Sequence, residues 1–151
     1  MNRKGELVFA FSVALMLAVV AGSCFAFAKP DEPTEGDLYD YEYVSDWNWG
    51  VDASVSGHWI WLWMLRPPWI GFDEETWTGN RWGGLGVWYV GWLYFTWGYD
   101  GNYYQNTTTE SSIIISRSVR CHHVYCKSGS WFTNIWTQQW YAETLYAQID
   151  M

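Results

Sequence analysis

Hydrophobic and polar residues alternate with a period of two along most of the chain beyond its apolar start. In "DLYDYEYV" (37–44) three tyrosines share one face, while Asp40 and Glu42 share the other. Such alternation is typical of an antiparallel strand that has one covered face. The segments 58–64 ("HWIWLWM") and 86–97 ("GVWYVGWLYFTW") are apolar on both faces instead. This pattern predicts strands that are covered on both sides.

Turn-forming residues separate the predicted strands. "YDGN" at 99–102 contains the Asp-Gly pair of a tight hairpin turn. The segment 67–84, "PPWIGFDEETWTGNRWGG", is rich in Gly, Pro and Asn and is predicted as a loop. A long strand is expected over 112–125. The end of the chain, 131–149, is predicted as strand, with a helix over "TQQWYAETLYAQI" as the alternative because of its Ala, Glu, Gln and Leu.

About six strands joined by glycine-containing turns, without a βαβ rhythm, indicate an all-β fold. The predicted architecture is a small antiparallel β-sandwich or a small barrel, and a C-terminal helix packed on a sheet is the alternative for the last element. No period of 20 to 50 residues repeats, which argues against a solenoid or a propeller.

The beginning of the chain predicts an export signal over residues 1–28. Arg3 and Lys4 precede an apolar run over 7–20, and the small-residue stretch "AGSCFAFAKP" follows. Positive, apolar and small-residue regions in this order are typical of a secretory leader, with cleavage expected after Ala28. We therefore expect the protein to be secreted or held at the cell surface.

Three other ways of processing the leader stay open. "AGSC" ending at Cys24 is similar to the lipobox of bacterial lipoproteins, which would add a lipid anchor. The run 7–28 is also long enough for an uncleaved membrane anchor. "RKGELVF" resembles an archaeal prepilin start with cleavage after Gly5, although Lys29-Pro30 would stop the assembly helix early.

The rest of the chain amounts to one domain, divided into an acidic segment (29–46) and a Trp-rich β domain (47–151). The whole chain has a formal net charge of −8. Nucleic acid and anionic lipid both require basic patches, so neither is expected as a partner. Membrane contact is expected only through an N-terminal lipid or an uncleaved anchor.

The cysteines beyond the leader form one pair, Cys121 and Cys126. An even pair in an exported protein predicts a disulfide. In an extended strand, however, residues five apart are separated by about 16 Å, so the bond requires "HHVY" between them to turn. "CHHVYC" also contains zinc-ligand residue types, but it lacks a second distant pair, and we predict neither a metal nor another cofactor.

The 14 tryptophans of the chain are too many for one small core, so some of them must reach the surface. Those flanked by apolar residues on both faces of a strand are predicted to be core residues: Trp59, Trp61, Trp63, Trp88 and Trp92. The tryptophans of the 67–84 loop lie beside carboxylates and amides, which suits binding. The predicted ligand-binding residues are Trp69, Asp73, Trp77, Asn80, Arg81 and Trp82.

Flat aromatic rings beside hydrogen-bonding side chains match the chemistry of sugars, whose C–H faces pack on rings while their hydroxyls bond to polar groups. The leading prediction is therefore a binding module for a cell-wall or surface glycan, or an adhesion module. Catalysis is not predicted, because the sequence places no pair of carboxylates at the spacing of a glycosidase and contains no nucleophile motif.

Two other function classes stay open. One is a secreted antimicrobial protein that acts on a cell envelope. The order of residues in "NYYQNTTTESSIIIS", "SGSWFTNIW" and "TLYAQI" is similar to lactococcin-type bacteriocins over less than half of the chain. The histidine-serine signature of that type is missing and the chain is acidic, so the sequence does not assign it to the family. The other class is a structural surface or filament subunit that assembles through strand edges.

Overall fold

The computed structural model describes residues 35–46 and 48–151. The predicted leader and the start of the acidic segment lie outside these residues. The strands are β1 (Glu35–Asp46), β2 (Trp49–Leu62), β3 (Trp69–Gly83), β4 (Val87–Tyr89), β5 (Leu93–Tyr99), β6 (Asn102–Thr108), β7 (Ser112–Arg117), β8 (His123–Asn134) and β9 (Trp140–Asp150). Within these described ranges no helix has the length and hydrophobicity to cross a membrane.

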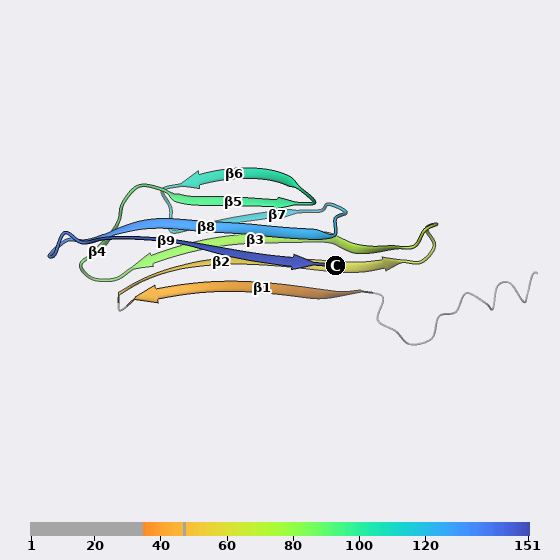
Figure 1. Cartoon of the computed structure of the whole chain (residues 1–151), viewed down its shortest axis with the longest axis horizontal. Coiled ribbons are helices and arrows are strands. Elements are labelled where there is room, and N and C mark those ends of the chain that lie inside the picture. The colour runs from red at the N-terminus through yellow and green to blue at the C-terminus, as the bar shows by residue number, and fades with distance from the viewer. Residues whose placement is uncertain (1–34, 47) are drawn as a thin grey trace, which may run out of the picture. The chain divides into compact units, whose positions relative to one another are not determined.

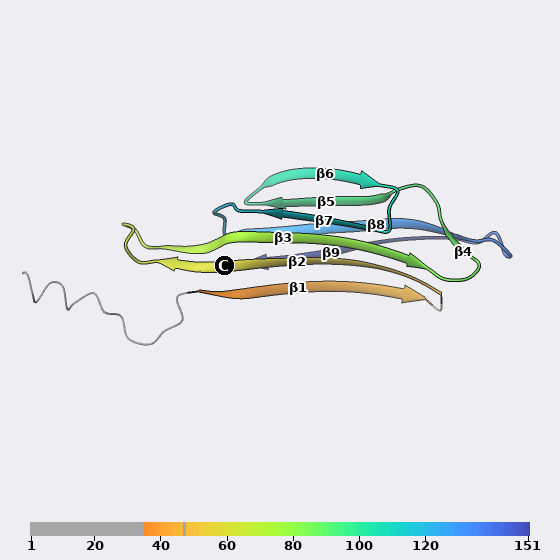
Figure 2. The ribbon, with the colours of Figure 1, turned by 180° about the vertical axis from the view of Figure 1, so that it is seen from behind.

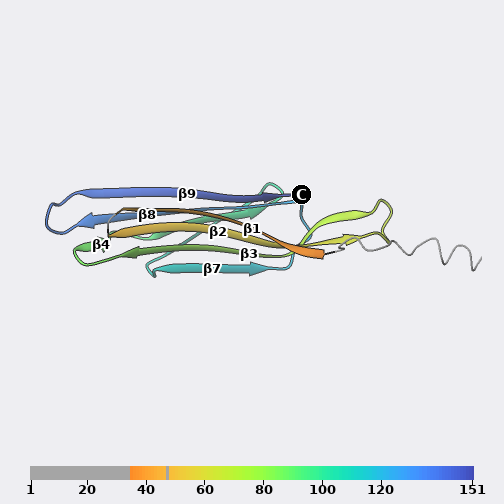
Figure 3. The ribbon, with the colours of Figure 1, turned by 90° about the horizontal axis from the view of Figure 1, so that it is seen from below.

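The strands form two antiparallel sheets that pack face to face (Figure 1). Sheet A has the order β1-β2-β3-β7. In sheet B, β8 pairs with β9 on one side and with β5 and β4 on the other, and β6 follows β5. Figure 3 separates β8 and β9 above from β2, β3 and β7 below. The predicted all-β sandwich is confirmed, and neither sheet closes into a barrel.

The last element of the chain is a strand and not a helix. Residues 140–150 form β9, which pairs along its whole length with β8. The helix alternative is therefore wrong, because pairing with a neighbouring strand outweighs the modest helix preference of Ala, Glu and Leu. The Asp-Gly turn is confirmed as well: Asp100 and Gly101 both have positive φ, as a two-residue hairpin turn between β5 and β6 requires.

Three predicted boundaries are wrong. The expected loop 67–84 is mostly β3, the longest of the described strands. The expected strand 86–97 is broken into β4 and β5, and the expected strand 112–125 is broken between β7 and β8. The glycines of β3 are not turn residues: a Cβ on Gly79 would stand 2.7 Å from the Phe95 ring. That glycine allows the two sheets to approach each other closely.

The core lies between the sheets and contains a different set of tryptophans from the predicted one. Trp77 is fully buried, and its ring lies 4.8 Å from the ring of Trp97, centroid to centroid. Residues packed in the same cluster are Ala53, Val55, Phe72, Phe95, Cys121, Val124, Cys126 and Ala147. Of the predicted core tryptophans, Trp59 and Trp61 are half-buried, and Trp63, Trp88 and Trp92 are exposed.

The predicted Cys121–Cys126 disulfide is absent, because both residues are free, buried thiols. The Cys121 Sγ donates to Glu75 Oε1 at 3.4 Å, and the Cys126 Sγ donates to the Ser54 carbonyl at 3.2 Å. Cys126 lies within the extended strand β8 and Cys121 just before it, so the chain does not turn back to join them. Burial raises the pKa of both thiols, that of Cys126 to about 12.

These two thiols are expected to react only after unfolding, because the reactive species is the thiolate and burial disfavours it. In a Cys24→Ser variant, a thiol reagent should label almost nothing in native protein and two groups in denaturant without reductant. Absence of label in denaturant would show that the disulfide exists after all.

A hydrogen bond joins the two sheets between β1 and β9. The backbone N–H of Gln148 on β9 donates to Asp40 Oδ2 on β1, at 2.8 Å. Asp40 lies on the face of β1 that turns toward sheet B, since its register partner on β2 is the buried Val55.

Candidate functional site

The six residues predicted to bind a ligand do not form one site. All of them lie on β3, spread over its whole length from Trp69 to Trp82. At about 3.3 Å per residue, the two ends are roughly 40 Å apart. Successive side chains of a strand also point to opposite faces, which separates neighbouring members of the set.

Two of the six point into the core. Trp77 has no exposed surface, and the Arg81 side chain is almost completely buried. Arg81 Nη1 donates to the Gly91 carbonyl and to Ser130 Oγ, both at 3.2 Å, and Nη2 donates to the Thr109 carbonyl at 2.7 Å. These bonds tie β3 to β8 and to two loops, so Trp77 and Arg81 support the fold.

The other four residues lie in two places. Asn80 and Trp82 are on the outer face of sheet A, where Asn80 Nδ2 donates to Asp52 Oδ1 at 2.7 Å. At the far end of β3, Trp69 lies beside His122, with 5.6 Å between ring centroids. The carbonyl of Asp73 accepts from Ser118 Oγ at 2.9 Å.

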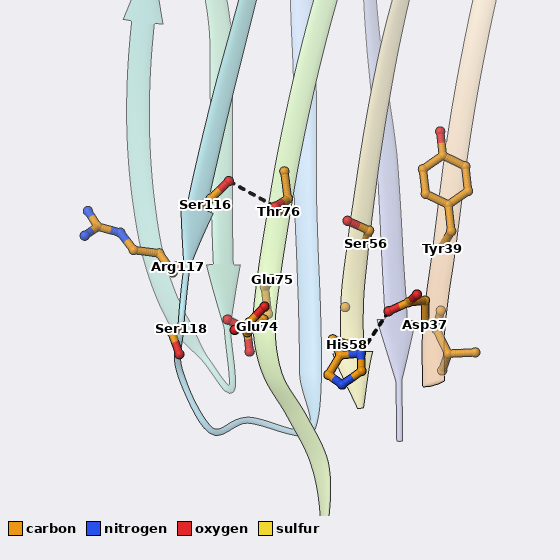
Figure 4. Close-up of a pocket in the computed structure, with 12 residues that line it drawn as sticks. Asp37, Tyr39, Ser56, His58, Glu74, Glu75, Thr76, Ser116, Arg117 and Ser118 are labelled. Atoms are coloured by element: carbon orange, nitrogen blue, oxygen red, sulfur yellow. Dashed lines mark hydrogen bonds and ion pairs between the residues drawn. The ribbon is translucent and has the colours of Figure 1, made fainter. Parts of the chain in front are cut away.

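A polar hollow of about 610 Å³ lies on sheet A near the start of β1. Figure 4 shows its side chains, with His58 and Asp37 pointing toward each other; His58 Nδ1 lies 2.9 Å from Asp37 Oδ1. This hydrogen bond raises the pKa of His58. The side-chain hydroxyls of Thr76 and Ser116 are hydrogen-bonded to each other, with 3.0 Å between Oγ1 and Oγ. Apart from the small His58 imidazole, Tyr39 is the one aromatic ring among the residues that line this hollow, so the hollow offers little surface for stacking.

A second hollow, of about 460 Å³, lies on the outer face of sheet B. We call it the aromatic groove. Its lining residues come from four strands: Tyr94, Thr96, Tyr103, Lys127, Gly129, Trp131 and Thr144. The register places Gly129 between Tyr94 and Thr144, where the missing side chain leaves space in the sheet face. Three aromatic rings line the hollow, and those of Trp131, Tyr94 and Tyr103 are 42%, 38% and 62% exposed.

The polar groups of the aromatic groove are hydroxyls and one ammonium. Thr96 lies opposite Lys127 in the register, and Lys127 lies opposite Tyr146. Within the described part of the chain Lys127 has no ion pair. Its ammonium is therefore available to a ligand. Thr144 is exposed as well, whereas Thr96 is only 4% exposed.

Further exposed rings extend the same face toward the β8–β9 turn. Trp88 on β4 and Trp140 on β9 both lie opposite Thr133 of β8, so one strand separates them. They are 66% and 64% exposed. The outer face of sheet B thus continues from the aromatic groove to a pair of tryptophans.

None of the residues that line the aromatic groove is among the ligand-binding residues predicted from the sequence. A signal was present, because Tyr125, Lys127, Gly129 and Trp131 occur at every second position and share one face of β8. The residues of "KSGS" within this stretch are of turn-forming type, which obscures the alternation. Nothing in the sequence showed which face of which strand would lie beside it.

Among the described residues, no group of three His, Cys, Asp or Glu side chains is placed to hold a metal ion. Comparison with known proteins adds no assignment: the chain matches no protein-family model, no curated protein sequence and no solved structure.

Proposed function

We propose that this domain is a glycan-binding module of a secreted or cell-surface protein, and that the aromatic groove is its binding site. The observation that carries the proposal is the gathering of three exposed rings around a hollow of about 460 Å³ on one sheet face. Concave sites lined by aromatic side chains with a few polar groups are the usual form of small-ligand sites.

The chemistry of the aromatic groove suits a sugar unit. The faces of Trp131 and Tyr94 offer large apolar surfaces against which the C–H groups of a pyranose ring can pack. Thr144 and Lys127, which are both exposed, supply hydrogen-bond partners for its hydroxyl groups. The position of Trp88 and Trp140 on the same face would allow a longer glycan to continue beyond the groove.

A glycan array probed with the full chain, followed by calorimetry on the best ligand, tests this function. The double variant Trp131→Ala/Tyr94→Ala is expected to weaken binding by at least about tenfold, because truncating an aromatic contact at the centre of a binding site often costs 2 kcal/mol or more. Thermal unfolding should change little, since both rings keep a large exposed surface.

Trp82→Ala is the matched control. Trp82 is 41% exposed, like Trp131, but lies on the outer face of the other sheet and belongs to the set predicted from the sequence. Loss of binding in Trp82→Ala with full binding in the groove variant would move the site to sheet A. An array without any bound glycan would contradict the function itself and favour a structural subunit.

A further inference from the structure

The turn between β2 and β3 exposes a cluster of apolar side chains at one end of the sandwich. We call residues 61–70 the apolar tip; its sequence is "WLWMLRPPWI". Trp63, Met64, Leu65 and Ile70 are 43%, 78%, 41% and 46% exposed. Scattered apolar residues on a surface are ordinary, but a contiguous exposed patch indicates an interaction site.

The apolar tip extends beyond its neighbouring strands. Among the described residues, the pairing of β1 with β2 ends at Glu35 and Ile60, and the pairing of β7 with β3 ends at Arg117 and Glu75. A single bridge beyond that point joins Phe72 to Cys121. Within the described residues, Trp61 pairs with Ile70 and Leu62 with Trp69, with no third strand beside them. Figure 1 and Figure 2 both show this hairpin projecting past the ends of the other strands.

The side chains of the apolar tip match the interfacial layer of a bilayer better than a glycan or a polar protein surface. Tryptophan prefers the level of the lipid headgroups, and leucine, methionine and isoleucine enter the adjoining acyl region. Arg66 is the single charged residue of this segment. Its guanidinium can reach a lipid phosphate while its stem stays in apolar surroundings.

The charges around the apolar tip set the depth to which it could enter. A second guanidinium, that of Arg120, lies 5.9 Å from the Trp69 ring centroid. The nearest carboxylates along β1, Glu35 and Asp37, lie at the level of Ile60 and His58. Met64 is four residues further along the chain, roughly 13 Å at full extension. Interfacial segments enter about 5 to 10 Å, so those carboxylates would stay in water.

We propose that the apolar tip inserts into the interfacial layer of a phospholipid bilayer and so docks the domain on a membrane surface. Met64 and Leu65 enter the layer between headgroups and acyl chains, and Arg66 pairs with a lipid phosphate. This contact is separate from the aromatic groove and does not depend on glycan binding. It is also additional to any membrane contact through the predicted leader.

Site-specific labelling of the full chain tests the insertion. In a Cys24→Ser background, whose Cys121 and Cys126 are buried, an environment-sensitive fluorophore is attached at Met64→Cys or, as the control, at Gln105→Cys on β6. The probe membrane is a phosphatidylcholine vesicle containing spin-labelled lipid. Emission from position 64 should be quenched severalfold and emission from position 105 should not. Bound protein with an unquenched label at position 64, or no binding to the vesicles, would overturn the proposal.

A partition measurement separates the apolar tip from the rest of the chain. Met64→Ser/Leu65→Ser should lower partitioning into the same vesicles by about tenfold or more, given the apolar surface that two such side chains bury. The matched control is Leu85→Ser/Ile114→Ser, which removes two apolar residues that are 84% and 67% exposed elsewhere. Equal losses in the two pairs would contradict insertion at the apolar tip. Shielding of position 64 that depends on protein concentration, without vesicles, would assign the surface to a second copy instead.

Discussion

Trp77→Ala is expected to lower the free energy of unfolding by about 3 to 5 kcal/mol, the usual range for removing a large buried aromatic side chain. The Trp77 ring is fully buried between the sheets and contacts the rings of Trp97 and Tyr99. Alanine would leave a cavity at the centre of the main core cluster. Urea denaturation followed by circular dichroism measures the loss.

Trp88→Ala is the control for this prediction, because the Trp88 ring is 66% exposed. Its unfolding free energy should stay within about 0.5 kcal/mol of the parent value, as for most surface substitutions. If the two alanine variants lost equal stability, the position of Trp77 in the core would be contradicted.

The second large effect is a decrease in stability as the pH rises from about 4.5 to about 7. Glu75 is almost completely buried, and this burial raises its pKa from the ordinary value of 4.5 to about 7. Between these pH values the folded protein retains a proton that the unfolded chain has lost. Stability therefore falls as pH rises through this window, by at most about 3 kcal/mol, and is constant with respect to Glu75 above it.

Glu75→Gln isolates this contribution, because glutamine is close in shape and does not ionise. The difference in unfolding free energy between pH 5 and pH 8 should be smaller in Glu75→Gln than in the parent chain. His58, whose pKa is also raised, adds a decrease of the same sign, but it is present in both proteins. Glu74→Gln on the exposed face is the control and should keep the parent pH dependence. An unchanged pH dependence in Glu75→Gln would contradict the assignment.

The fold class could be predicted because strand periodicity is a local property. The alternation in 37–44 follows from the pleat of a strand alone, and Tyr39, Tyr41 and Tyr43 do share the exposed outer face of β1. The Asp100-Gly101 turn could be predicted for the same reason: its positive φ values are a local requirement that those two residues satisfy.

The assignment of core and surface tryptophans failed because burial depends on neighbouring strands. Trp61 and Trp63 have apolar neighbours along the chain, but this part of the β2–β3 hairpin extends past β1 and β7, the described strands that flank it in sheet A. Trp77 is surrounded by turn-type residues in the sequence, yet its strand lies at the centre of sheet A, where Gly79 allows close packing. The sequence pattern could not supply either fact.

The aromatic groove could not be predicted for a related reason. It brings together residues of β5, β6, β8 and β9, from Tyr94 to Thr144. Alternation within one strand shows which side chains share a face, but it does not show which strands pair. The hollow forms because Gly129 lies between Tyr94 of β5 and Thr144 of β9, and this placement is set by the register of the three strands.

The hydrogen bond between Gln148 and Asp40 also bears on solubility. Among the described strands, β9 pairs only with β8 and forms an edge of its sheet. Unpaired backbone groups at such an edge can template the addition of a strand from another molecule. Asp40 Oδ2 already occupies one of these donors, at 2.8 Å, and places a carboxylate beside the edge. An incoming strand would have to break this bond and approach a negative charge. The sandwich thus protects one of its edges against aggregation with a side chain from its opposite sheet.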